Sequence, residues 1–218
     1  MEISVKDGGF HIDGVPDAIK LIKLNGHKAR RVADLALHRS DLEFAKECLT
    51  RINMFLNPSD AVVRQALWKT AICQYMKCFG NSVSRGQLSA EKILKGDSLG
   101  LDIHQYFKDL RNKHIIHDEN DVAQCWPGAA INDGKKTYKV EKIISFSLTA
   151  DTLIEESYSN LDKLVGTSIS WVKDEFERLC TELTTELEAV PYHELINRPS
   201  VAHRKPEIDG AGVKREKP

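Results

Sequence analysis

The chain has 218 residues, of which 41% are hydrophobic and 29% charged, and its formal net charge is -1 at pH 7. This composition is typical of a globular protein with one sizeable core. The near-neutral net charge gives no overall basic field that would indicate nucleic acid binding, so RNA would have to bind in a local cleft. No apolar run approaches the roughly 20 residues of a membrane span, so we expect no contact with a membrane.

The five cysteines form no Cys-x-x-Cys pair and lie at positions 48, 73, 78, 125 and 180. This spacing favours neither a zinc site nor a disulfide framework, and reduced cysteines are usual in the cytoplasm. The N-terminus also lacks the basic and apolar layout of a secretion signal. We therefore expect a cytoplasmic protein that uses no metal and no cofactor.

Residues 1–26 are predicted to form a small β-hairpin followed by a linker. Apolar residues alternate with polar ones on both sides of the turn signal Asp7-Gly8-Gly9, at Ile3, Val5, Phe10 and Ile12. A helical period of apolar residues then runs from Gly26 to about residue 55. Within it, Ser40 and Glu43 fit either a capping box between two helices or the exposed face of one helix.

Three further helices are predicted before the pattern changes. The apolar period favours helices over residues 59–79, 89–95 and 99–117, and Gly80 is placed to end the first of them. A polar stretch with three acids, Asp118-Glu119-Asn120-Asp121, follows the last of these helices.

A second β-hairpin and the longest helix follow. Residues 122–131 and 137–148 have strand character around Asn132-Asp133-Gly134, which is a strong hairpin turn signal. Apolar residues then recur at steps of three or four over residues 150–190, with Gly166 as a candidate kink or break. A helix of about 40 residues would be about 60 Å long, so it needs a long bundle or a second subunit beside it.

The chain is therefore predicted to be mainly α, with three parts. After the N-terminal part, residues 27–190 form a helical domain in which a β-hairpin, at about 121–148, is inserted before the last long helix. Residues 191–218 contain four of the seven prolines and few apolar residues, which is the composition of a disordered tail.

The segment from Arg111 to His117 concentrates an arginine, an amide, a lysine and two histidines. Steps of four and three, the period of a buried helix face, connect five positions: Ile103, Phe107, Leu110, His114 and His117. On one α-helix these positions fall within about 80°, so the inner stripe changes from apolar to imidazole. The plainer alternative is that the histidines are core residues and that Arg111 pairs with Asp118.

Arg111, Asn112 and His117 together resemble the signature of HEPN domains, in which a polar residue follows an arginine and a histidine lies four to six residues beyond it. Residues 110–117 are also similar to abortive-infection proteins of that superfamily. The resemblance covers about residues 27–190 and implies a HEPN-like antiparallel helical bundle with the motif late in its third main helix. Outside the motif it depends on the helix pattern.

The resemblance implies a metal-independent endoribonuclease that leaves a cyclic phosphate. The 2′-hydroxyl of RNA is the nucleophile in such a reaction, and the protein supplies proton transfer and a cation for the phosphorane. Histidine suits proton transfer and arginine suits phosphate oxygens, so we assign catalytic roles to His117 and Arg111. Asn112 would hold the substrate or orient the histidine, while Lys113 and His114 are candidates for substrate binding.

On one ideal helix Arg111 and His117 would point about 120° apart and lie about 9 Å apart along its axis, so a single chain would not direct both at one phosphate. HEPN ribonucleases are homodimers whose motifs meet across the interface, and the resemblance implies the same here. It also implies toxin or phage-defence action on RNA, with a cognate antitoxin or another protein as partner. Some HEPN toxins carry a tyrosine shortly after the motif histidine, and a partner nucleotidyltransferase modifies this tyrosine to silence the toxin. Here Asp118-Glu119-Asn120 follows the histidine, which puts that kind of regulation in doubt.

Two other functions compete with the ribonuclease. The first is a non-catalytic HEPN-like module for protein interaction or substrate binding, favoured by the acids after His117, which would repel RNA. The second is a metal site formed by His114, His117 and Asp118, but no further ligand pattern supports it.

Overall fold

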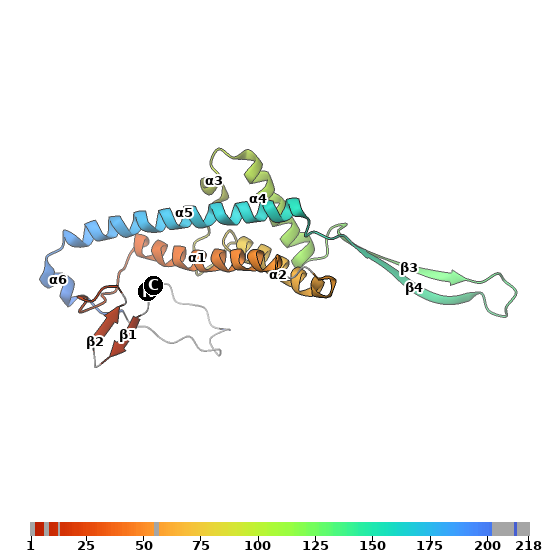
Figure 1. Ribbon diagram of the computed structural model, residues 1–218, viewed down its shortest axis with the longest axis horizontal. Helices are drawn as coiled ribbons and strands as arrows, with labels where there is room; N and C mark the ends of the chain where they lie inside the picture. The colour runs from red at the N-terminus through yellow and green to blue at the C-terminus, as the bar shows by residue number, and fades with distance from the viewer. Residues whose placement is uncertain (1–2, 7–8, 13, 55–56, 202–211, 213–218) are drawn as a thin grey trace. The chain divides into compact units, whose positions relative to one another are not determined.

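The structure is a computed structural model that describes residues 3–6, 9–12, 14–54, 57–201 and 212 of the chain. It confirms a mainly helical protein with two small antiparallel sheets of two strands each (Figure 1). The chain divides into two compact units. Unit 1 comprises Met1–His38, Asn81–Gly86 and Val172–Pro218, and unit 2 comprises Arg39–Gly80 and Gln87–Trp171.

The first sheet confirms the predicted N-terminal hairpin. Strand β1 (Ile3–Lys6) pairs with β2 (Gly9–Ile12) in antiparallel register, with Ile3 opposite Ile12. Asp7 and Gly8 of the predicted turn lie outside the described residues.

Helix α1 (His27–Ile52) is continuous, so the Ser40–Glu43 pair does not divide it. Glu43 instead accepts a hydrogen bond of 2.7 Å from Arg39 one turn earlier, and Ser40 is exposed on the same helix. A short 3-10 turn, η1 (Pro58–Asp60), precedes α2 (Ala61–Lys77), and α3 (Ala90–Ile93) and α4 (Ser98–Leu110) follow.

Helix α5 (Glu155–Glu188) confirms the predicted long helix and runs through Gly166 without a break. A Cβ at Gly166 would meet nothing within 4 Å, so no close packing requires glycine there. None of the helices among the described residues combines the length and the apolar character needed to cross a membrane.

The core of unit 2 forms between α2 and α4, with buried residues of α1 and α5 in the same unit. Trp68 and Phe107 are fully buried and meet edge to face, with ring centroids 6.0 Å apart. The Trp68 indole N–H donates to the Thr152 hydroxyl at 3.0 Å, which satisfies the polar atom of a buried ring. This aromatic contact joins α2 to the helix that carries the motif.

In unit 1, Gly86 joins its segment to α1. The Gly86 N–H donates to the Asp34 carboxylate at 2.9 Å, and the Gly86 carbonyl lies 2.7 Å from His38 Nε2. Arg31 Nη1 also reaches this carbonyl, at 3.4 Å. One glycine therefore contacts three side chains on successive turns of α1.

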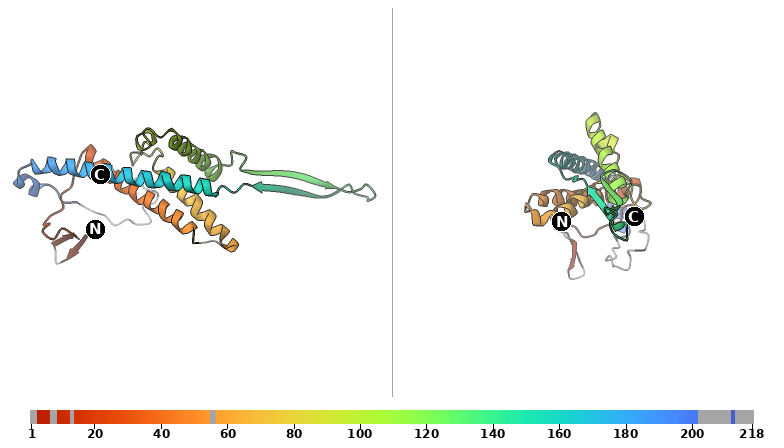
Figure 2. Two further views of the ribbon diagram at one scale, coloured as in Figure 1. Left: turned by 45° about the horizontal axis from the view of Figure 1, so that its top comes forward. Right: turned by 90° about the vertical axis from the view of Figure 1, so that its right-hand side faces the viewer.

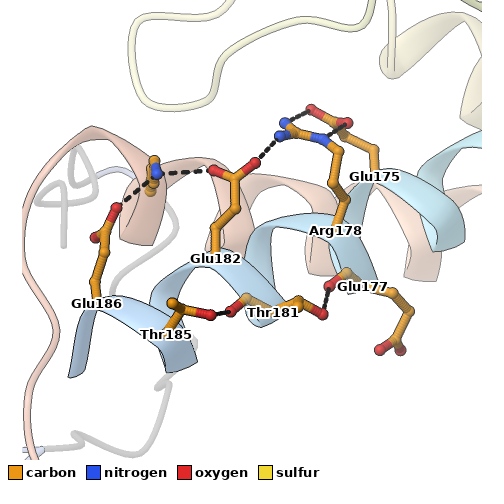
Figure 3. A network of polar contacts seen from close by, with 8 residues as sticks. Glu175, Glu177, Arg178, Thr181, Glu182, Thr185 and Glu186 are labelled. Atoms are coloured by element: carbon orange, nitrogen blue, oxygen red, sulfur yellow. Dashed lines mark hydrogen bonds and ion pairs between the residues drawn. The ribbon is translucent and has the colours of Figure 1, made fainter. Parts of the chain in front are cut away.

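The C-terminal part of α5 carries a network of exposed charges in unit 1 (Figure 3). Glu175 accepts two hydrogen bonds of 2.8 Å from Arg178, which also pairs with Glu182. Lys28 of α1 then contacts Glu182 at 2.7 Å and Glu186 at 2.6 Å. Exposed pairs of this kind contribute little to stability individually.

The segment predicted as a disordered tail begins with ordered structure. Helix α6 (Tyr192–Asn197) is followed by a bridge between Ser200 and Ile22. The Lys23 N–H donates to the Pro199 carbonyl at 2.7 Å, and Val201 N–H donates to the Leu21 carbonyl at 2.9 Å. Composition did not reveal this pairing because backbone groups supply it.

The second hairpin is the predicted insertion before the last long helix. Strand β3 (Ala123–Ile131) pairs along its length with β4 (Val140–Thr149), and all ten residues of β4 are exposed. Figures 1 and 2 show the two strands side by side, with no other described element of unit 2 laid over them. The turn contains Gly134 at φ +79°, a backbone conformation that favours glycine.

Candidate functional site

The motif follows directly from α4, whose start is set by a local cap. The Asp97 carboxylate accepts a hydrogen bond of 2.8 Å from the Gly100 N–H. A Cβ on Gly100 would lie 2.7 Å from the Asp97 carboxylate, so a larger residue at this position would displace the capping side chain. The helix then buries Phe107 and Leu110 before the motif begins.

The motif itself is a π-helical segment, η2 (Arg111–Ile116), in which the backbone hydrogen bonds span five residues. The His117 N–H donates to the Asn112 carbonyl at 3.1 Å, which closes this wide turn. Segments of this kind are rare and often occur at functional sites because they change the direction of side chains within a helix.

The π-helical turn contradicts the predicted stripe of buried histidines. The α-helix ends at Leu110, and His117 has an extended backbone at φ -122° and ψ 158°. Its side chain is exposed, and that of His114 is half-buried. The predicted angle of about 120° between Arg111 and His117 assumed a regular α-helix and does not apply to this segment.

Asn112 connects the other two motif residues. Its side-chain oxygen accepts a hydrogen bond of 2.7 Å from Arg111 Nη1, and its backbone carbonyl accepts the one from the His117 N–H. Both Arg111 and Asn112 are half-buried. The alternative pairing of Arg111 with Asp118 is not seen among the described contacts.

Arg111 lies close to helix α2. Burial raises the pKa of the Cys73 thiol on that helix, and the positive charge of Arg111 partly opposes this shift. The guanidinium therefore donates to Asn112 on its own segment and lies near the neighbouring helix. A half-buried arginine that one amide holds has donors left for an anion, since guanidinium carries five N–H groups.

The two candidates for substrate binding differ from one another. Lys113 is exposed and forms an ion pair of 3.1 Å with Asp109, one turn earlier on α4. His114 is half-buried, and its Nδ1 is buried without a hydrogen-bond partner in the described part of the chain. Lys113 is thus accessible to a ligand, whereas His114 presents only part of its ring.

The acids after the motif are at the surface. Asp118, Glu119 and Asp121 are exposed, and the Glu119 N–H donates to the Lys113 carbonyl at 2.8 Å, which continues the turn beyond His117. Negative charge therefore lies within a few residues of the exposed imidazole, as the sequence indicated.

A buried polar pair lies in the same unit and was not predicted from the sequence. Tyr75 of α2 and His104 of α4 share a hydrogen bond of 2.9 Å between the phenol oxygen and Nδ1. Burial raises the pKa of Tyr75 and lowers that of His104, so both groups are neutral at pH 7. The only signal in the sequence was His104 beside Ile103, at the edge of the apolar stripe.

Within the described residues, no three His, Cys, Asp or Glu side chains gather as a metal site would require. The use of no metal and no cofactor remains a prediction. No family model, curated protein or solved structure matches the chain. The site must therefore be interpreted from its own residues.

Proposed function

We propose that the chain is a metal-independent endoribonuclease that acts as a homodimer and has a HEPN-like helical bundle. One observation carries the proposal: Asn112 holds Arg111 through its side chain and His117 through its backbone. A cation is thereby held on the same short segment as an exposed imidazole, whose backbone Asn112 anchors. A cation and a proton carrier are among the groups that cleavage of RNA without a metal requires.

The reaction would use the substrate's own nucleophile. The 2′-hydroxyl oxygen forms a bond to the adjacent phosphorus and gives its proton to a base, and the bond to the 5′-oxygen breaks as that oxygen takes a proton from an acid. The products are a 2′,3′-cyclic phosphate and a 5′-hydroxyl. His117 transfers protons, and Arg111 stabilises the charge on the non-bridging oxygens.

Two proton carriers are needed, and each chain offers one exposed motif histidine. The other carrier is His114 of the same segment or, as the resemblance implies, a motif histidine of a second copy of the chain. The expected biological role is that of a toxin or phage-defence effector, controlled by a cognate antitoxin or another partner protein.

An interaction module is the second candidate, and the exposed hairpin favours it. Strand β4 presents apolar side chains to solvent, and the exposed acids Asp118, Glu119 and Asp121 directly follow the motif. A protein that only binds a partner would keep this surface and would not need His117.

The test is cleavage of a mixed RNA panel in EDTA by the purified protein, His117→Ala and Arg111→Ala. We expect each variant to lose at least about 100-fold in rate, because each removes proton transfer or charge stabilisation. His117 is exposed, so His117→Ala should unfold at the same temperature as the wild type.

Two controls make the result specific. His193→Ala removes another exposed histidine and should leave cleavage unchanged. A substrate with 2′-deoxy sugars should resist the wild type, because the nucleophile is missing. Equal cleavage by the wild type and the His117 variant, or none by either, would reject the enzyme and favour the interaction module.

A further inference from the structure

One face of the second hairpin is apolar and uncovered. The strand register puts alternate residues of β3 and β4 on this apolar face: Gln124, Trp126, Gly128, Ala130, Lys142, Ile144, Phe146 and Leu148. Its four large side chains remain about half exposed, at 48% for Trp126, 49% for Ile144, 59% for Phe146 and 56% for Leu148. Trp126 and Phe146 stack across the strands, with centroids 6.2 Å apart.

Such a face needs a second layer. A two-stranded hairpin is marginally stable in water by itself, and a large exposed apolar patch marks an interaction surface. The four large side chains leave roughly 100 Å² each accessible, about 400 Å² per copy. A standard interface takes about 800 Å² from each partner. An adequate interface therefore requires contact along the whole hairpin, from its base to its tip.

The sizes of the side chains indicate what would fit. Near the base of the hairpin the apolar face carries Trp126, Phe146 and Leu148, whereas near the tip β3 contributes Gly128 and Ala130, opposite Ile144 and Lys142 of β4. Along β3, the large Trp126 at one end and the two small residues at the other are complementary to the same strand turned end for end. Alternation of large and small residues across facing layers is how cores fill space.

The charges of the hairpin are also complementary end for end. Around the tip, residues 133–142 contain four lysines and two acids. At the base, residues 118–121 and 150–156 contain six acids and no lysine or arginine. Antiparallel packing of two copies brings each basic tip to the partner's acidic base. A nucleic acid lying along the hairpin would instead meet the acids.

We propose that the apolar face of the β3–β4 hairpin packs against the same face of a second copy of the chain, antiparallel about a two-fold axis. The hairpins are about 34 Å long, so each tip reaches the stretch after the partner's His117. In so far as the proposed ribonuclease holds, the partner's lysines then offset the acids beside each motif and add to its phosphate-binding surface. The two motifs lie at opposite ends of the paired hairpins, about 34 Å apart, so each site takes its second proton carrier from its own segment, with His114 as the candidate.

Gly128 provides a direct test. A Cβ at this position meets nothing within 4 Å in the chain, and the backbone φ is not positive, so Gly128→Phe fits the isolated hairpin. In the dimer the ring would occupy the space of the partner's large side chains. Ala129→Phe adds the same ring to the opposite face and is the matched control.

Sedimentation equilibrium without RNA measures the result. We expect the wild type and Ala129→Phe to have twice the chain mass of 24.6 kDa. Gly128→Phe should weaken dimerisation about tenfold or more, as overpacking of an interface does. Circular dichroism should show all three equally folded. A monomeric wild type, or an equal dimer in both variants, overturns the proposal.

Zero-length carbodiimide cross-linking tests the orientation. In an equal mixture of ¹⁵N-labelled and unlabelled protein, we expect mixed-isotope links that join Lys139 or Lys142 to acids of residues 118–121 or 151–156. Cross-links that only ever join peptides of the same isotope lie within one chain, and they would overturn the antiparallel arrangement. Cross-links that join only the two tips would overturn it as well. Neither experiment uses RNA cleavage. A protein that cleaves no RNA would therefore reject the proposed ribonuclease, whereas the sedimentation and cross-linking results alone decide the proposed dimer.

Discussion

Acid should destabilise unit 1 through a single buried histidine, His38 of α1. This side chain is 0% exposed, and its Nε2 lies 2.7 Å from the Gly86 carbonyl. Burial lowers the pKa of His38 from 6.5 to about 4, although the bond to Gly86 opposes the shift. The charges of Arg85 and Arg31 add to the lowering, and Asp34 opposes it.

The sign and size of the effect follow from proton linkage. Below pH 6.5 the unfolded chain binds a proton at His38, whereas the folded chain does so only near pH 4. The free energy of unfolding therefore falls as the pH falls through this window. One pKa unit corresponds to about 1.4 kcal/mol, so the full shift amounts to about 3 kcal/mol.

Urea unfolding between pH 7.5 and 4.5 would measure this loss in the wild type, His38→Gln and His193→Gln. Glutamine keeps an N–H donor for the Gly86 carbonyl but does not titrate, so the His38 variant should lose much less stability on acidification. The exposed His193 is the control and should follow the wild type. Parallel pH profiles for the wild type and His38→Gln would refute the reasoning.

Three further predictions concern the helical units. Tyr75→Phe leaves Nδ1 of the buried His104 without its partner and should lower the free energy of unfolding by about 1–3 kcal/mol. The control Tyr106→Phe, at an exposed phenol, should change this free energy by less than about 0.5 kcal/mol. Equal effects of the two variants would contradict the pairing. Leu161→Ala at a fully buried site should cost about 2–5 kcal/mol in the same assay, and a loss below about 1 kcal/mol would show that the site collapses. Arg178→Ala removes the centre of an exposed ion network and should leave the thermal midpoint nearly unchanged in 0.15 M salt; a marked fall would show that the network acts cooperatively.

Helix type and extent were largely predictable because they depend on local pattern. Apolar steps of three and four predicted a helical pattern over residues 150–190 with Gly166 as a candidate kink or break, and α5 runs through that glycine as one helix. The turn signal at Asn132-Asp133-Gly134 predicted the second hairpin in the same way. In both cases the hydrogen bonds that define the element lie within a few residues or in an adjacent strand.

The geometry expected at the candidate site was wrong in part, and the functional roles of its residues remain predictions. The pattern identified Arg111, Asn112 and His117, and the structure joins all three through Asn112. The predicted stripe placed His117 with the buried Phe107, but the backbone leaves the α-helix before it. Whether the backbone forms α-helical hydrogen bonds, which span four residues, or π-helical ones, which span five, depends on how both ends of the segment pack. The apolar periodicity of the sequence contains no information about that packing.

The sequence by itself determined the mainly helical class, the two hairpins and the set of motif residues, because propensity, turn chemistry and apolar period act over short distances. Tertiary structure decided which side chains are buried or exposed. It places His38 against Gly86 and Tyr75 against His104, and it leaves Trp126 in solvent. These contacts join residues far apart in the chain, and their energies depend on burial that only the folded arrangement creates.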